Sequence, residues 1–255
     1  MRLKQAAGWN QVESDWQTVM RVSPDGCWVF EADGRAVGSA TAVAFGKDLA
    51  WIGMVLVLPE YRRRGIARQL METAVRWCEA RGVAAIKLDA TDLGRPLYRS
   101  MGFVDEEPIE RWGRDPGEVA GSLASGGAID WDLDRRGFGC DRRLMLDALA
   151  AAPDADLLAA DGVFGMSRPG SNARFLGPVI GESRDATARV IRGLLAAHAD
   201  TPWFWDLLPE SGPAASLAEE LGFRRLRSLT RMSRPAPRAF GDPALVWATA
   251  GFEYG

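Results

Sequence analysis

The sequence predicts an α+β fold made of two consecutive units, each with a mixed central sheet flanked by helices. Apolar strand patterns and amphipathic helix patterns follow one another in a similar order in both halves of the chain. The segment LYRSMGF at 97–103 also aligns with LAEELGF at 217–223, at a constant offset of 120 residues. Such internal similarity is expected when one α+β unit is used twice.

Length and composition bound the class of protein. At roughly 150 residues per domain, the 255 residues make one large domain or two small ones. The formal charge of −3 lacks the strong basic excess of a nucleic-acid-binding protein, so no nucleic-acid partner is expected. No apolar run approaches the ~18 residues of a membrane span, and no secretory signal is visible. We therefore expect a cytoplasmic protein with no membrane partner.

The metal-ligating residue types are few and badly placed. The three cysteines lie far apart, and His198 is the single histidine, so neither a disulfide framework nor a zinc site is predicted. Asp130, Asp132 and Asp134 have the spacing of a calcium loop, but Arg135 occupies the position at which that loop needs glycine. No metal is expected.

The first unit reads as a series of well-marked elements. Trp9, Trp16 and Val19 recur at helical spacing and predict an opening helix. A continuous apolar strand at 51–58 stops at a proline, and the next helix runs from Ile66 until a glycine closes it. Further strands are predicted at 27–30, 37–45, 85–90 and from 103 onward, with a short helix opening at 94–96.

A glycine- and serine-rich stretch separates the units. The composition changes at 113–127, which predicts a linker or a long excursion. We therefore divide the chain into a first domain at 1–112, a linker at 113–137 and a second domain at 138–255. In the second domain, helices are predicted at 142–151, 185–199 and 214–221, and strands at 157–160, 163–167, 174–180, 203–208 and 223–233.

The turn after the apolar strand has the chemistry of an anion site. Arg62-x-x-Gly65-x-Ala67 leads directly into a helix, where backbone N–H groups and the helix dipole both favour negative charge. Gly65 permits close approach of a phosphate, and Arg63, Arg64 and Arg68 add positive charge around it. Taken alone, the same pattern also fits a solvated run of arginines at a helix start.

Two motifs together resemble the GNAT superfamily of acyl-CoA-dependent N-acyltransferases. The turn at 62–67 resembles the superfamily's motif A, and 97–103 resembles its Leu-Tyr-x-x-x-Gly-Phe element. The resemblance covers about 1–112 well and the rest more weakly, and it implies a GNAT-like α/β domain in tandem with a second. It also implies that the turn binds the pyrophosphate of acetyl-CoA and that the preceding strand pairs with the pantetheine arm. The residues implied for cosubstrate binding are Val55, Leu56, Val57, Arg62, Arg63, Arg64, Gly65, Ile66, Ala67, Arg68 and Asp92.

The resemblance also assigns one catalytic role and leaves another open. It implies that Tyr98 protonates the departing CoA thiolate, although a half-buried tyrosine bonded to backbone would look the same. Many relatives place a glutamate base on the central strand, where this chain has Trp51. Asp89, Asp92 or a water relay are the remaining candidates for the base. Asp89 shares a strand face with Lys87, so an ordinary ion pair is an equally good interpretation.

In this superfamily the first helices and their loop line the acceptor site. Their positions nominate Trp9, Asn10 and Trp16, with core packing as the alternative for the tryptophans. Trp51 is similarly ambiguous, and Asp206, on the strand that matches the Asp89 strand, is a further candidate for this pocket. In the second half, alanine replaces the tyrosine, and 182–187 lacks the glycine and carries two carboxylates, which should repel CoA.

The sequence thus predicts a tandem acyltransferase with one active domain. It is expected to transfer an acetyl group from acetyl-CoA to the amine of a small-molecule acceptor. The alternative is a non-catalytic module that binds acyl-CoA as a sensor or regulator. Neither the acceptor nor the oligomeric state follows from the sequence.

Overall fold

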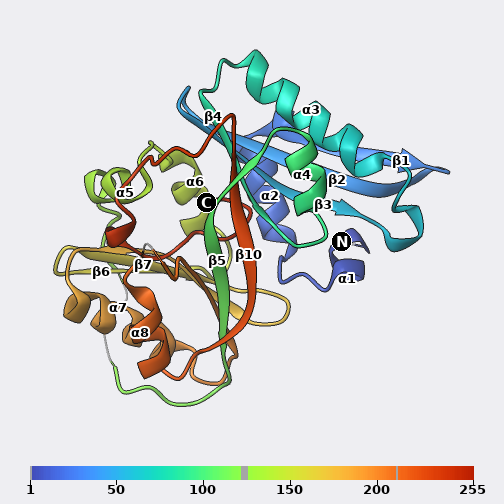
Figure 1. The fold of residues 1–255 in the computed structure, drawn as a ribbon. Coiled ribbons are helices and arrows are strands. Elements are labelled where there is room, and N and C mark those ends of the chain that lie inside the picture. The colour runs from blue at the N-terminus through green and yellow to red at the C-terminus, as the bar shows by residue number, and fades with distance from the viewer. Residues whose placement is uncertain (1, 122–125, 211) are drawn as a thin grey trace.

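In the part of the chain that the structure describes, one sheet of eleven strands runs through both halves (Figure 1). The computed structural model describes residues 2–121, 126–210 and 212–255. The helices are α1 (Arg2–Ala7), α2 (Glu13–Val22), α3 (Ile66–Ala80), α4 (Arg95–Ser100), α5 (Trp131–Phe138), α6 (Arg143–Ala150), α7 (Arg184–Ala197) and α8 (Ala214–Glu220). The strands are β1 (Cys27–Ala32), β2 (Arg35–Phe45), β3 (Leu49–Val57), β4 (Ala85–Ala90), β5 (Val104–Arg114), β6 (Asp156–Ala160), β7 (Val163–Arg168), β8 (Arg174–Gly181), β9 (Trp203–Leu207), β10 (Arg224–Arg234) and β11 (Val246–Ala248).

The two halves exchange their last long strands. The order is β1-β2-β3-β4-β10-β5-β9-β8-β7-β6, so β10 pairs with β4 of the first half while β5 pairs with β9 of the second. The β3–β4 and β8–β9 pairs are parallel and the others are antiparallel, which confirms the mixed sheet. Figure 1 shows β5 and β10 side by side where the halves meet. The halves are successive along the chain, but each half of the shared sheet includes the last long strand of the other half.

Buried ion pairs repeat the internal symmetry at this junction. Arg111 on β5 donates to both carboxylate oxygens of Asp206 on β9, at 2.7 and 2.6 Å. The residue 120 positions further on, Arg231 on β10, donates to both oxygens of Asp89 on β4, at 3.0 and 3.2 Å. Each arginine therefore anchors an exchanged strand to the half that receives it.

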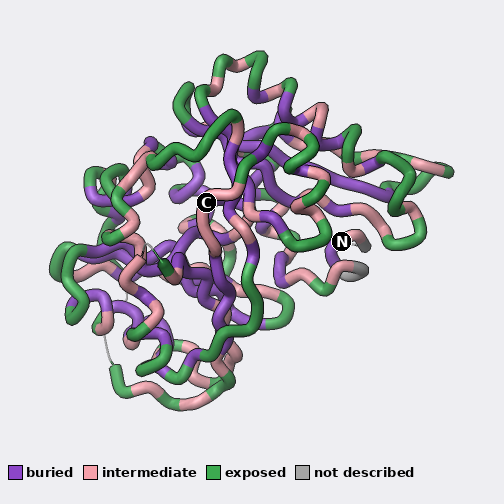
Figure 2. Tube along the Cα trace, viewed as in Figure 1, coloured by how far each residue is buried: buried purple, intermediate pink, exposed green. Residues whose placement is uncertain are grey.

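Helices cover the sheet, and a shared core joins the halves. The α3 helix presents Ile66, Leu70, Ala74 and Cys78 on one face, the spacing expected of an amphipathic helix, and packs on β2 and β3. One hydrophobic cluster includes Trp51 of the first half together with Met145 and Phe164 of the second. Figure 2 shows that buried residues follow the sheet while exposed ones lie along the outer turns and helix faces.

The structure departs from the sequence expectations at several elements. The single helix expected around Trp9 and Trp16 is instead two helices, because α1 ends at Ala7 and α2 begins at Glu13, which leaves Trp9 between them. At the start of α2, Asp15 accepts a hydrogen bond from the Val12 backbone N–H at 2.8 Å. The expected linker at 113–137 contains most of α5, and Asp130 caps that helix by accepting from two backbone N–H groups. Part of this expected linker, 122–125, lies outside the described residues. The short strand β11 had no sequence signal strong enough to predict it.

Candidate active site

A local divergence of two parallel strands opens the site. β3 pairs with β4 only from Leu49 to Trp51, after which the two strands separate. The pairing of β3 with β2 shifts register in the same region, and Met54 has a left-handed φ of 50°. The Ser39 hydroxyl donates to the Met54 carbonyl at 2.9 Å, which holds this irregular backbone. Beyond Trp51, the β4-facing edge of β3 therefore has no strand partner among the described residues, although the Arg62 Nε–H donates to the Val57 carbonyl at 3.1 Å.

The turn that follows β3 presents backbone N–H groups to the same opening. Gly65 is the N-cap of α3 and has a φ of 79°, a conformation that side-chain-bearing residues rarely adopt. A Cβ at this position would lie within 4 Å of only one atom, Gln69 Nε2 at 3.9 Å, so the turn is open on that side. The first N–H groups of α3 have no partner within the helix. This geometry suits a phosphate at the helix start.

Most of the predicted cosubstrate residues line one groove of about 720 Å³. The groove brings together nine of them: Val55, Leu56, Val57, Arg62, Arg63, Gly65, Ile66, Ala67 and Arg68. Arg64 is an exception, because its guanidinium donates to the Glu60 carbonyl and lies over the Tyr61 ring. Asp92 is the other exception: it is exposed, whereas its neighbours Thr91 and Leu93 line the groove.

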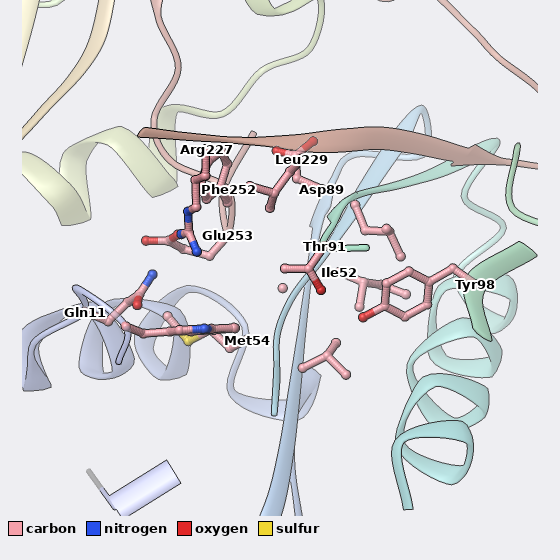
Figure 3. Close-up of a pocket in the computed structure, with 14 residues that line it drawn as sticks. Gln11, Ile52, Met54, Asp89, Thr91, Tyr98, Arg227, Leu229, Phe252 and Glu253 are labelled. Carbon is pink, nitrogen blue, oxygen red and sulfur yellow. The ribbon is translucent and has the colours of Figure 1, made fainter. Parts of the chain in front are cut away.

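Tyr98 lies at the inner end of the groove. The side chain is buried on α4, and its ring packs against Gly94, where a Cβ would come within 2.8 Å of the ring. No described residue hydrogen-bonds to the hydroxyl, which points into the pocket in Figure 3. Burial raises the pKa of Tyr98 to about 12. The hydroxyl is therefore a protonated donor at neutral pH, and the alternative of a tyrosine bonded to backbone does not apply.

A smaller cavity of about 80 Å³ continues from the groove. It shares Trp9, Val55, Thr91, Tyr98 and Arg227 with the groove, so the two spaces meet at Tyr98. The deeper wall comes from both halves of the chain: Gln11, Ile52, Gly53, Met54, Leu88, Asp89, Leu229, Phe252 and Glu253 (Figure 3). Gln11, Arg227, Phe252 and Glu253 were not predicted, because no local motif connects them to the site.

Asp89 lines this cavity, but its carboxylate is engaged in an ion pair. Both of its oxygens accept hydrogen bonds from Arg231. Burial raises the pKa of Asp89, and the charge of Arg231 opposes this shift. The expected ion pair with Lys87 is absent from the described residues, because Lys87 pairs with Glu106 at 2.8 Å. The structure thus places Asp89 in the wall of the site as part of a structural pair.

Asn10 does not face the cavity. Its Nδ2 donates to the Ala173 carbonyl at 2.9 Å, and its Oδ1 accepts from the backbone N–H groups of Asn172 and Ala173. This corrects the expectation that Asn10 binds substrate. Asn10 instead fixes the loop before α2 to the second half, and thereby positions Trp9 and Gln11.

The other three acceptor candidates also lie elsewhere. Trp16 packs against the core shared by the halves. The Trp51 indole N–H donates to the Phe252 carbonyl at 3.0 Å, and the Arg231 guanidinium lies 4.7 Å from the centre of its ring. Asp206 is fully buried in its pair with Arg111. Of the five candidates, Trp9 is the one that lines the groove and the cavity.

In the second half, the opening between the parallel strands β8 and β9, which corresponds to the one between β3 and β4, is filled by the strand β11. Lys87 pairs with Trp51 across β4 and β3, and Phe204 pairs with Phe175 across β9 and β8. If these pairs are matched, Val55 and Leu56 correspond to Val179 and Ile180, the region of β8 that pairs with β11. The Trp247 indole N–H on β11 donates to the Gly181 carbonyl at 3.0 Å. A strand of protein therefore occupies the edge that stays free in the first half.

The described residues hold neither a metal-binding cluster nor a membrane-spanning helix. Within 2–121, 126–210 and 212–255, no three His, Cys, Asp or Glu side chains are grouped to hold an ion. No helix in these ranges is long and apolar enough to cross a bilayer.

The fold and the two motifs define an acyltransferase of tandem construction, and comparison with known proteins supports this. Residues 4–103 match the model of the Acetyltransferase (GNAT) family, and 131–244 match that of an Acetyltransferase (GNAT) domain. The chain is 30% identical over 196 residues to the uncharacterized N-acetyltransferase YitH of Bacillus subtilis (strain 168), covering 71% of this chain and 68% of that protein. The chain belongs to the GNAT acetyltransferase family.

Two solved structures share the fold over most of its length. One, from Pyrococcus horikoshii, has a TM-score of 0.81 at 22% identity and covers 95% of this chain and 84% of that one. A tandem GNAT protein from the clavulanic acid biosynthesis pathway has a TM-score of 0.65 at 15% identity, with coverage of 93% and 94%. The prediction of a tandem GNAT acyltransferase is confirmed.

Proposed function

We propose that the protein transfers an acetyl group from acetyl-CoA to the amine of a small-molecule acceptor. The observation that carries this proposal is the single groove that joins the Gly65 turn, the free edge of β3 and the Tyr98 hydroxyl. In this proposal the Gly65 turn and the acid Tyr98 belong to 1–112, and the unit at 138–255 is a degenerate unit with no acetyl-CoA site of its own. The small enclosed cavity beyond Tyr98 favours a small acceptor, or a narrow amine-bearing end, over a protein surface.

Each part of the groove has a role in this proposal. The N–H groups at the start of α3, with Arg62, Arg63 and Arg68, bind the phosphates, and Val55 to Val57 offer backbone partners to the pantetheine arm. The acceptor nitrogen attacks the thioester carbonyl, and backbone N–H groups near Val57 stabilise the oxyanion. The carbon–sulfur bond breaks, its electron pair goes to sulfur, and Tyr98 Oη donates the proton.

Two measurements test the proposal. Calorimetry should detect CoA binding that weakens in Arg63→Ala, because a charge-assisted contact to phosphate is lost. Thiol release from acetyl-CoA should depend on a primary amine drawn from a panel of small amines. Binding without amine-dependent thiol release would favour the sensor, and failure to bind CoA would reject both interpretations.

A further inference from the structure

The C-terminal segment brings part of the second half into the first-half site. After β11, the chain returns to β3, where a Cβ on Gly53 would come within 2.9 Å of the Glu253 carbonyl oxygen. Arg168 donates to the Ala250 carbonyl at 2.8 Å, and the Gly255 N–H donates to the Gly251 carbonyl at 3.0 Å. Together with the bond from Trp51 to Phe252, these contacts fix Glu253 against the edge of the cavity.

Two buried oxygens in this cavity lack a donor. Glu253 is 5% exposed; its Oε1 accepts from Arg168 at a long 3.4 Å, and its Oε2 has no partner among the described residues. Gln11 Oε1 is likewise buried without a partner. Both side chains line the same cavity, and Figure 3 shows them on the same side of it. A buried oxygen without a donor is costly, and a ligand with several N–H groups would satisfy both.

The nearby cations are largely committed to other carboxylates. Arg111 forms its short pair with Asp206, and Arg168 also pairs with Asp15 at 3.3 Å. Arg227 faces both the groove and the cavity, and its guanidinium lies 5.3 Å from the Phe252 ring centre. Burial raises the pKa of Glu253, as expected for a carboxylate whose charge is incompletely matched. Trp9 and Phe252 add aromatic surface, which attracts a cation.

We infer that Glu253 Oε2 and Gln11 Oε1 bind the ammonium group of the acceptor, so that the second half supplies a substrate-binding carboxylate to the first. The inference rests on the proposed function. The ammonium gives one proton to Glu253 and becomes a neutral amine, whose lone pair forms the new carbon–nitrogen bond as the carbon–sulfur bond breaks. Tyr98 gives a proton to sulfur, and the proton that leaves nitrogen as the amide forms restores the tyrosine. Glu253 passes its proton to solvent.

The test uses butylamine as the cationic probe and butan-1-ol as its neutral counterpart, titrated by ligand-observed NMR with and without saturating CoA. Wild type should bind butylamine more tightly than butan-1-ol, and Glu253→Gln should weaken butylamine binding about 10- to 100-fold, because a charge-assisted contact is lost. Butan-1-ol should bind wild type and Glu253→Gln with the same affinity. Glu219→Gln, which removes an exposed carboxylate on α8, is the matched control and should change nothing.

A second variant keeps the test independent of the stability of Glu253→Gln. The Gln11 amide makes no hydrogen bond to a described residue, so Gln11→Met should leave the fold intact and weaken butylamine binding about 3- to 10-fold. Butylamine that does not bind wild type, or that binds every folded variant equally, overturns the inference. CoA affinity is measured on the same samples. If the proposed function is wrong, wild type will not bind CoA, and this result is separate from the result with butylamine.

Discussion

Replacing Asp206 with asparagine tests whether the exchanged strands are held by buried charge. The substitution removes the charge that faces Arg111, whose side chain is 7% exposed and lies among the rings of Phe175, Phe204 and Phe252. Leaving one member of such a pair buried costs about 3–5 kcal/mol. At about 2–4 °C per kcal/mol for a chain of this size, the midpoint of thermal unfolding should fall by about 6–20 °C.

Two further variants make this prediction specific. Asp115→Asn breaks the exposed pair with Arg224, where both side chains are more than half exposed, and should leave the unfolding midpoint unchanged. The double variant Arg111→Met with Asp206→Leu removes both charges and should recover most of the lost stability. If Asp206→Asn unfolds at the same temperature as wild type and has a raised KM for the acceptor, this reasoning is refuted and Asp206 is again a candidate for the acceptor site.

Three other outcomes follow from the site. Tyr98→Phe should lower kcat about 10²- to 10⁴-fold with unchanged CoA affinity. Because burial raises the pKa of Tyr98 to about 12, deprotonation of this group should not lower the wild-type rate until the pH nears that value. A decline in rate at lower pH that is absent in Tyr98→Phe would contradict this. Gly65→Ala should weaken CoA binding in calorimetry and cost about 1–2 kcal/mol of stability at its φ of 79°, whereas Gly82→Ala, with a φ of 66° at the far end of α3, should cost similar stability and leave CoA affinity intact. CoA should saturate at one molecule per chain, and a second equivalent site would show that β11 does not block the second half.

The local patterns of the sequence were enough for most elements, but the pairing of the strands was not. β5 and β10 have the same length and lie 120 residues apart, so each looks like the closing strand of its own unit. Nothing local distinguishes pairing of β10 with β4 from pairing with β9, because the choice depends on contacts such as Arg231 with Asp89. The loop before α2 was missed for a related reason. Trp9 and Trp16 keep helical spacing, but hydrogen bonds from the distant segment 171–173 to Asn10 hold Trp9 in a loop.

The candidate site also has one part that the sequence predicted, the groove, and one part that it did not, the inner cavity. Most of the groove comes from two short segments, 55–68 and 91–98, which contain or adjoin the two motifs, and local patterns therefore predicted it. The inner cavity combines the loop before α2 with β10 and the C-terminal segment, which come together only through the fold. Asp89 and Asp206 are carboxylates on matching strands, as expected of a base and of an acceptor ligand. The arginines that pair with them lie on the exchanged strands, which the sequence did not predict.

The C-terminal segment links the second half to the cavity in the first half. β11 fills the edge of β8 that corresponds to the free edge of β3, and the next residues carry Glu253 to Gly53. The Thr249 N–H donates to the Asp206 carbonyl at 3.0 Å, which fixes the point at which the segment leaves β9. A CoA molecule at the β8 edge would have to displace β11, and the connected residues would then lose their hold on the acceptor cavity. The filled edge of the second half and the position of Glu253 in the first-half cavity therefore depend on the same segment, and under the inference above this segment is how the second unit contributes to acetyl transfer.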